Sequence, residues 1–140
     1  MTEEPEIETG IRKTNHLLIE AVQRGSAETV EALLLVGADA NARTPDGRTP
    51  LMFAAVTGNA KIVEILLEAG ADPDVQALDG STALLKACMW GHEDVVEILI
   101  TAGADREIES DDGWSPINIA LHMGQDGIAR LLKTTGAKNI

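Results

Sequence analysis

TPDGRTPLMFAAVTGNAKIVEILLEAGADPDVQ, residues 44–76, is the stretch that decides the fold, because most of the remaining chain repeats it with changes. A shift of 33 residues brings equivalent positions into register without a gap. The shift aligns three Asp-Gly pairs: Asp46-Gly47, Asp79-Gly80 and Asp112-Gly113. It also aligns four alanines: Ala21, Ala54, Ala87 and Ala120. Self-similarity at a fixed period of this length predicts a repeat protein.

Each position that the copies share has a mechanical role. Gly47 suits a tight hairpin turn, since glycine accepts a positive φ angle. Thr49 is a suitable helix N-cap, and Pro50 fits the first helical position, where a missing N–H costs nothing. Apolar residues then recur at a spacing of three to four, which predicts a short first helix ending at Gly58 and a second ending near Gly70. Each repeat therefore reads as turn, helix, helix.

A single unit of this kind has an apolar face that only a neighbouring unit can cover, so the units are expected to stack as a solenoid. The sequence resembles the ankyrin repeat family over residues 12–138. The resemblance is carried by these residues and their counterparts one and two periods later: Gly47, Thr49, Pro50, Leu51, Ala54, Ala55, Gly58, Leu66, Leu67, Gly70, Ala71 and Asp72. It implies an all-α fold, a solenoid of four helix-turn-helix repeats joined by β-hairpin-like turns.

The chain divides into a short tail and one domain. Residues 1–10 are polar and acidic and are predicted to be a disordered tail. Residues 11–140 are predicted to form a single ankyrin repeat domain of the usual size. Its repeats are expected at about 11–43, 44–76, 77–109 and 110–140. The first repeat lacks the hairpin signal and the last carries Lys133 where its neighbours are apolar, so both are expected to act as polar caps.

Composition limits the partners. The formal net charge is −12, from 11 Lys and Arg against 23 Asp and Glu. Phosphate contacts require clustered cations, so neither nucleic acid nor an anionic membrane is expected as a partner. A basic protein or peptide would be attracted, although such a charge also serves solubility. The free protein is expected to be a monomer.

The compartment is predicted to be the cytoplasm. No apolar run approaches the length of a membrane span, and the N-terminus MTEEPEIETG is acidic where a secretory signal would be basic. Cys88 is the only cysteine, so no internal disulfide is possible, and its alignment with Ala55 predicts a buried small residue. No cofactor is predicted.

The sequence offers few candidates for chemistry. His92 follows Gly91 where the resembled family usually has Gly-His, so a structural role is expected. Ser115 aligns with Thr49 and is interpreted as a helix cap. The acidic stretch Asp105–Asp112 resembles a calcium loop but has no glycine at the sixth position. The main prediction is that the protein is not an enzyme. The alternative is a metal-regulated or catalytic protein that uses this stretch near His122.

The resemblance also implies where a partner would bind, because ankyrin-like proteins typically use hairpin tips and the inner ends of the first helices. These line a concave groove. Carried over position by position, the partner-binding residues are Arg48, Val56, Leu78, Asp79, Ser81, Met89, Trp90, Asp111, Asp112, Trp114, His122 and Met123. Both tryptophans of the chain are in this set, beside methionines and carboxylates, as in binding hot spots with a polar rim. The alternative is that Trp90 packs on Trp114 and fills space.

The predicted function is a non-catalytic protein–protein interaction module. It could be an adaptor, an assembly chaperone or an inhibitor that occludes an enzyme. Its partner would be a protein, basic in charge and with an apolar anchor for the groove. A self-associating structural unit is a further alternative, in which the repeats stack end to end.

Overall fold

The computed structural model describes residues 6–134 of the chain, with side chains from residue 10 onward. These residues form eight helices and no strand, which confirms the all-α prediction. The helices are α1 (Glu6–Arg24), α2 (Ala27–Leu35), α3 (Pro50–Thr57), α4 (Ala60–Glu68), α5 (Ala83–Trp90), α6 (Glu93–Thr101), α7 (Pro116–His122) and α8 (Asp126–Thr134).

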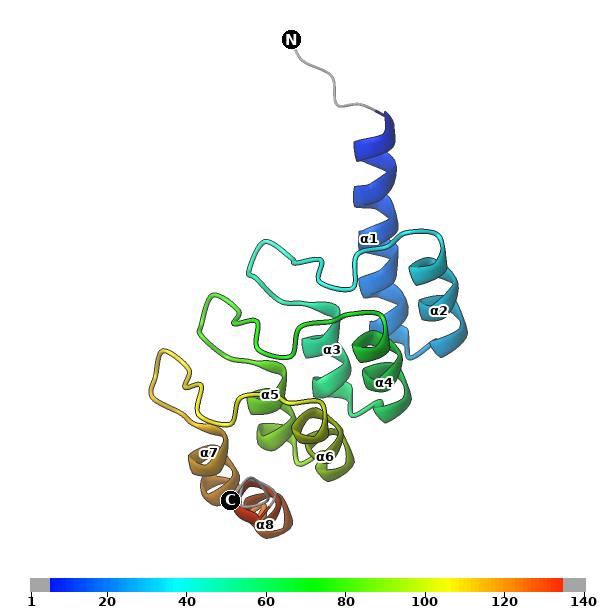
Figure 1. Ribbon diagram of the computed structural model, residues 1–140. Helices are drawn as coiled ribbons and strands as arrows, with labels where there is room; N and C mark the ends of the chain where they lie inside the picture. The colour runs from blue at the N-terminus through cyan, green and yellow to red at the C-terminus, as the bar shows by residue number, and fades with distance from the viewer. Residues whose placement is uncertain (1–5, 135–140) are drawn as a thin grey trace.

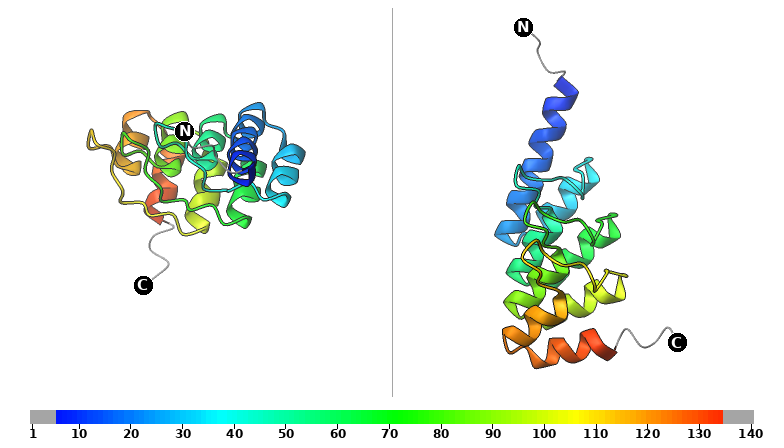
Figure 2. Two further views of the ribbon diagram at one scale, coloured as in Figure 1. Left: turned by 90° about the horizontal axis from the view of Figure 1, so that it is seen from above. Right: turned by 90° about the vertical axis from the view of Figure 1, so that its left-hand side faces the viewer.

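The helices pair in sequence order and the pairs stack in one row (Figure 1). The first helices α1, α3, α5 and α7 form one layer and the second helices α2, α4, α6 and α8 form another, with long loops projecting from the side of the first layer (Figures 1 and 2). Each helix contacts the other member of its pair and its equivalents in the adjacent pairs. The fold is therefore the expected solenoid, in which each unit is covered by its neighbours.

The first helices begin and end where their local signals place them. The Thr49 side chain accepts a hydrogen bond from the backbone N–H of Met52 at 3.3 Å, and Gly58 ends α3 in the left-handed conformation at φ 78°. Thr82 and Ser115 cap α5 and α7 through equivalent bonds of 3.2 Å each. The predicted caps are confirmed, and each one satisfies a backbone donor that the first helical turn leaves unpaired.

Small residues at the centre of the stack bring the helices close together. Ala54, Ala87 and Ala120 are fully buried, and so is Cys88, as its alignment with Ala55 predicts. Burial raises the pKa of the Cys88 thiol to about 12, since the charged thiolate is disfavoured away from water. Cys88 therefore stays a neutral thiol at physiological pH and serves as packing volume rather than as a nucleophile.

The N-terminal region differs from the prediction. Helix α1 begins at Glu6, so residues 6–10, expected to be disordered, belong to a helix; residues 1–5 lie outside the described part of the chain. The first repeat has no turn glycine, and the helix continues through the place of the hairpin. Thr14, which occupies the glycine position, donates its hydroxyl to the Gly10 carbonyl at 2.7 Å. Figure 1 shows this part of α1 extending beyond the other helices.

Candidate functional site

The loops between the pairs fold as three equivalent hairpins, residues 44–48, 77–81 and 110–114. Each hairpin is closed by a backbone bond of 2.9 Å from its first N–H to its last carbonyl. Neighbouring hairpins are joined as well: Leu78 N donates to the Asp46 carbonyl at 3.0 Å, and Asp111 N donates to the Asp79 carbonyl at 2.9 Å. The three hairpins and the adjacent side of α3, α5 and α7 are called the hairpin face. Their bonding holds that face in a fixed arrangement.

Within the second hairpin, Asp79 organises the turn. Its Oδ1 atom accepts hydrogen bonds from the Ser81 hydroxyl at 2.6 Å and from the Ser81 backbone N–H at 3.0 Å. These bonds lower the pKa of Asp79, chiefly through the Ser81 hydroxyl. Ser81 is only 2% exposed. Ser81 is expected from the sequence among the partner-binding residues, but its side chain is buried and engaged with Asp79, so it presents no exposed surface to a partner.

In the first hairpin, Asp46 plays the same part with different partners. Its carboxylate accepts from the Thr44 hydroxyl, which lowers the pKa of Asp46, and forms a 2.8 Å salt bridge with Arg48 Nε. The Arg48 guanidinium also lies over the Phe53 ring, with Cζ 4.7 Å from the ring centroid. Arg48 thus has an electrostatic partner on each side, and the cation–π contact fixes it on the floor of the hairpin face.

Two hollows open on this floor and share Arg48 and Lys86. The larger, of about 350 Å³, is lined by Gln23, Arg48, Met52, Phe53, Val56, Thr57 and Lys86. The smaller, of about 190 Å³, is lined by Asp46, Arg48, Ala77, Leu78, Asp79 and Lys86. The predicted site contains Arg48, Val56, Leu78 and Asp79 but not Lys86. The sequence did contain a signal for Lys86, because it aligns with the apolar Phe53 of the preceding repeat. A cation at that position would lie on the floor of the predicted groove.

Trp90 is the last residue of α5, and its side chain is 58% exposed. Met123, one repeat later, is 46% exposed at the end of α7. Met89 is half-buried against the core. Trp114 is partly buried and pairs with His122, whose ring centroid lies 4.9 Å away at an angle of 46°. Trp114 therefore packs on His122, and the aromatic stacking of Trp90 on Trp114 is absent from residues 10–134.

The predicted residues fall into two groups. Leu78 and the carboxylates Asp79, Asp111 and Asp112 are exposed at the hairpin tips. Trp90 lies at the far end of α5 from its hairpin, and an eight-residue helix is about 12 Å long. Neither tryptophan lines the two hollows described above, which share Arg48 and Lys86. The expected single apolar cluster is instead two exposed groups on one face.

The remaining candidates for chemistry have structural partners. His92 Nε2 lies 2.9 Å from the Val56 carbonyl and bridges two adjacent repeats, which confirms its structural role. The Asp105 carboxylate accepts from the Glu107 N–H at 2.8 Å within the acidic stretch. Across residues 10–134, no three His, Cys, Asp or Glu side chains lie close enough to hold a metal ion. The metal-regulated alternative therefore has no geometric support in that part of the chain.

The sequence was compared with protein families and with curated proteins. A family model described as ankyrin repeats, in three copies, matches residues 4–77 and 69–140. No curated protein matches the sequence. In the described part of the chain, no helix is both long enough and apolar enough to span a bilayer.

Proposed function

Since the chain belongs to the ankyrin repeat family, whose repeats are generally protein–protein interaction modules, we propose that it is a non-catalytic module that binds a partner protein through its hairpin face. An adaptor, an assembly chaperone and an inhibitor would all use such a surface in the same way. The proposal rests on what this face exposes.

The observation that carries the proposal is the exposure of both Trp90 and Met123. These large apolar side chains occupy equivalent positions in adjacent repeats and are 58% and 46% exposed. Tryptophan is among the residues most enriched in binding hot spots, where a rigid ring loses its contact with water. The other tryptophan, Trp114, is instead partly buried against the core and packs on His122.

The charges on this face favour a basic partner with an apolar anchor. Asp79, Asp111 and Asp112 are exposed at the hairpin tips. The cations on the floor are already compensated, Arg48 by Asp46 at 2.8 Å and Lys86 by Asp79 at 4.0 Å. A basic segment would therefore be attracted to the tips, and complementary charges of this kind raise association rates and select among partners.

The site is tested by replacing its anchors. The partner is first isolated from native lysate on the wild-type protein and is then titrated against the double variant Trp90→Ala, Met123→Ala. Loss of a hot spot costs about 2 kcal/mol or more, so the dissociation constant should rise by about 30-fold or more. Ile11→Ala is the matched control, because Ile11 is 49% exposed on the projecting part of α1 and should leave the affinity unchanged. Equal affinity of the double variant and the wild type would show that the partner binds elsewhere.

Fluorescence gives an independent readout. The chain has two tryptophans, so Trp114→Phe leaves Trp90 as the only one. The emission of Trp90 should shift to shorter wavelength when the partner displaces water from its ring. Unshifted emission at saturating partner would exclude Trp90 from the interface.

A further inference from the structure

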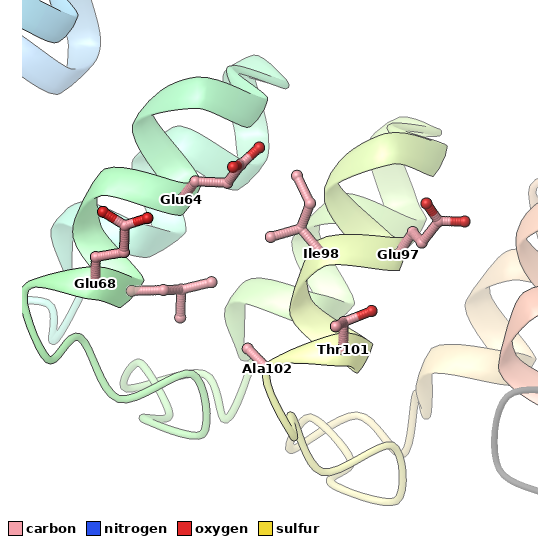
Figure 3. A pocket seen from close by; sticks show the side chains of 7 residues that line it. Glu64, Glu68, Glu97, Ile98, Thr101 and Ala102 are labelled. Atoms are coloured by element: carbon pink, nitrogen blue, oxygen red, sulfur yellow. The ribbon is translucent and has the colours of Figure 1, made fainter. Parts of the chain in front are cut away.

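A second surface lies on the opposite layer of the molecule, where the second helices α2, α4 and α6 face outward. It contains two hollows, each between adjacent helices. The hollow of about 360 Å³ between α4 and α6 is lined by Glu64, Leu67, Glu68, Glu97, Ile98, Thr101 and Ala102 (Figure 3). The hollow of about 330 Å³ between α2 and α4 is lined by Glu31, Leu34, Leu35, Ile65, Glu68 and Ala69. These twelve residues, with Glu68 shared by both hollows, are called the outer face.

The two hollows are copies of one another. A shift by one repeat carries the Leu34 and Ile65 of the first hollow onto the Leu67 and Ile98 of the second, and carries Glu31 onto Glu64. Each hollow thus has an apolar floor, with a leucine from one helix and an isoleucine from the next. Figure 3 shows Glu64 and Ile98 on the facing sides of α4 and α6. The outer face therefore repeats a shallow, open apolar hollow that has carboxylates beside it.

The charge of this face is almost entirely negative. Helix α2 carries two carboxylates, α4 two and α6 three, while Lys61 is their only cation. Lys61 lies in the first turn of α4 and lines neither hollow. Among residues 10–134, no salt bridge is found for Glu31, Glu64, Glu68 or Glu97. These carboxylates are therefore available to cations from outside the chain.

We infer that the outer face binds a basic amphipathic helix of a partner protein, at a site separate from the hairpin face. Adjacent packed helices lie about 8–10 Å apart, so the equivalent carboxylates Glu31, Glu64 and Glu97 repeat at about that distance. In a helix, residues seven apart lie about 10.5 Å apart on one face. Lysines or arginines at this spacing would each meet one glutamate. Aliphatic side chains three or four residues further on would enter the apolar hollows, as in other helix-in-groove complexes.

Other occupants are disfavoured by the same charges. A nucleic acid or an anionic membrane would be repelled by the glutamates, since both present phosphate or other negative groups. A second copy of this chain would bring its own net charge of −12 and no basic helix among α2, α4 and α6. A cationic helix with one apolar side could place its apolar side chains in the hollows and pair its cations with the carboxylates.

The test uses the full-length chain and a synthetic peptide of about eighteen residues in an alanine-rich, helix-favouring background. Three lysines are placed seven residues apart, with leucines three and four residues after each. The triple variant Glu31→Gln, Glu64→Gln, Glu97→Gln should weaken peptide binding by about threefold or more, because each of the three exposed ion pairs contributes about 0.2–1 kcal/mol. Calorimetric titration measures the dissociation constants, and circular dichroism verifies that each variant is folded.

The matched control removes three exposed carboxylates from other surfaces: Glu107→Gln, Glu109→Gln, Asp126→Asn. It changes the net charge equally and should alter binding less than about twofold, within the range of general screening effects. Equal weakening by both triple variants would overturn the proposal, as would equal affinity for a peptide whose lysines are spaced five residues apart. Concentration-dependent dimers in sedimentation that Ile98→Thr abolishes would identify a second copy as the occupant instead and also overturn it. Trp90→Ala should leave peptide binding unchanged, which separates this result from the proposed function.

Discussion

One residue position shows how a repeat can hold its backbone while its surface changes. Arg48, Ser81 and Trp114 are equivalent in sequence, at the end of each hairpin. Arg48 is exposed and lies over Phe53, Ser81 is buried against Asp79, and Trp114 extends along α7 to His122. The repeat register predicts the place of each residue on the chain. It does not predict the direction of its side chain, because that depends on neighbours that differ between repeats.

Asp79 makes the stability of the fold depend on pH. Its pKa is lowered in the folded state, so it adds stability above its unfolded value of about 3.9 and loses it as the pH falls through the folded value. Asp79→Asn cannot ionise. At pH 7 the variant should melt at a lower temperature than the wild type. The loss in free energy of unfolding should be less than about 1 kcal/mol, because the carboxylate is mostly exposed.

Thermal melts from pH 7 down to pH 2 measure the difference. The gap between wild type and Asp79→Asn should close as the pH falls below about 3.9, the pKa of the unfolded chain, and on through the lowered pKa of the folded state. Asp112→Asn, which removes one exposed charge from the next hairpin, controls for the change in net charge. A gap that stays constant down to pH 2 would contradict the assignment.

At the scale of the helix, caps decide the boundaries more than apolar content does. Helices α3, α5 and α7 each begin after a Thr or Ser whose hydroxyl accepts a backbone N–H. These starts could be predicted because the capping side chain and the N–H that it accepts are only three residues apart in the sequence. The start of α1 could not be predicted in this way: with no turn glycine near residue 14, nothing stops the helix, and it continues back to Glu6.

Thr82 tests the importance of such a cap. Its hydroxyl accepts the Leu85 N–H at 3.2 Å, and the residue is 2% exposed. Thr82→Ala removes the acceptor and should lower the free energy of unfolding by about 1–2 kcal/mol. Thr82→Ser keeps the hydroxyl and should lose less. Urea denaturation compares the three proteins, and equal losses for alanine and serine would show that the methyl group, not the cap, stabilises α5.

At the scale of the whole molecule, the solenoid was predictable from the sequence, and the shape and exposure of its surfaces were only partly so. The period of 33 residues gives the stacking directly, since every shared residue serves contacts between neighbours. The proposed binding surfaces lie at positions that vary between repeats; there the sequence analysis did not include Lys86, which lines both hollows, and did not predict the burial of Ser81. The hollows of the outer face could not be predicted, because Leu67 and Ile98 recur in the same helices as the buried residues and the period alone does not show that they are partly exposed.

Stacking between neighbours predicts that stability differs along the row. Ile62 in α4 and Ile128 in α8 are equivalent, and both are nearly fully buried. Ile→Val at either site removes one methylene and costs about 0.5–1.5 kcal/mol locally. In hydrogen exchange, Ile128→Val should speed exchange mainly in α8, which has one neighbouring pair among the described helices.

Ile62→Val should speed exchange in α2, α4 and α6 together, since α4 contacts both of the others. Native-state exchange followed by mass spectrometry resolves the helices separately. Identical exchange profiles for the two variants would mean that the row unfolds only as a whole, with no independent opening at its end.

The bonds between hairpin tips also give the row a direction. Leu78 and Asp111 each use a backbone N–H to join the preceding hairpin, but their counterpart in the first hairpin is Pro45, which has no N–H to donate. Helix α1 occupies the place where a preceding hairpin would stand. A further hairpin grafted ahead of residue 44 would therefore find no donor at Pro45. Lengthening this protein by repeat insertion would succeed between existing hairpins, where both a donor and an acceptor are present, rather than ahead of the first.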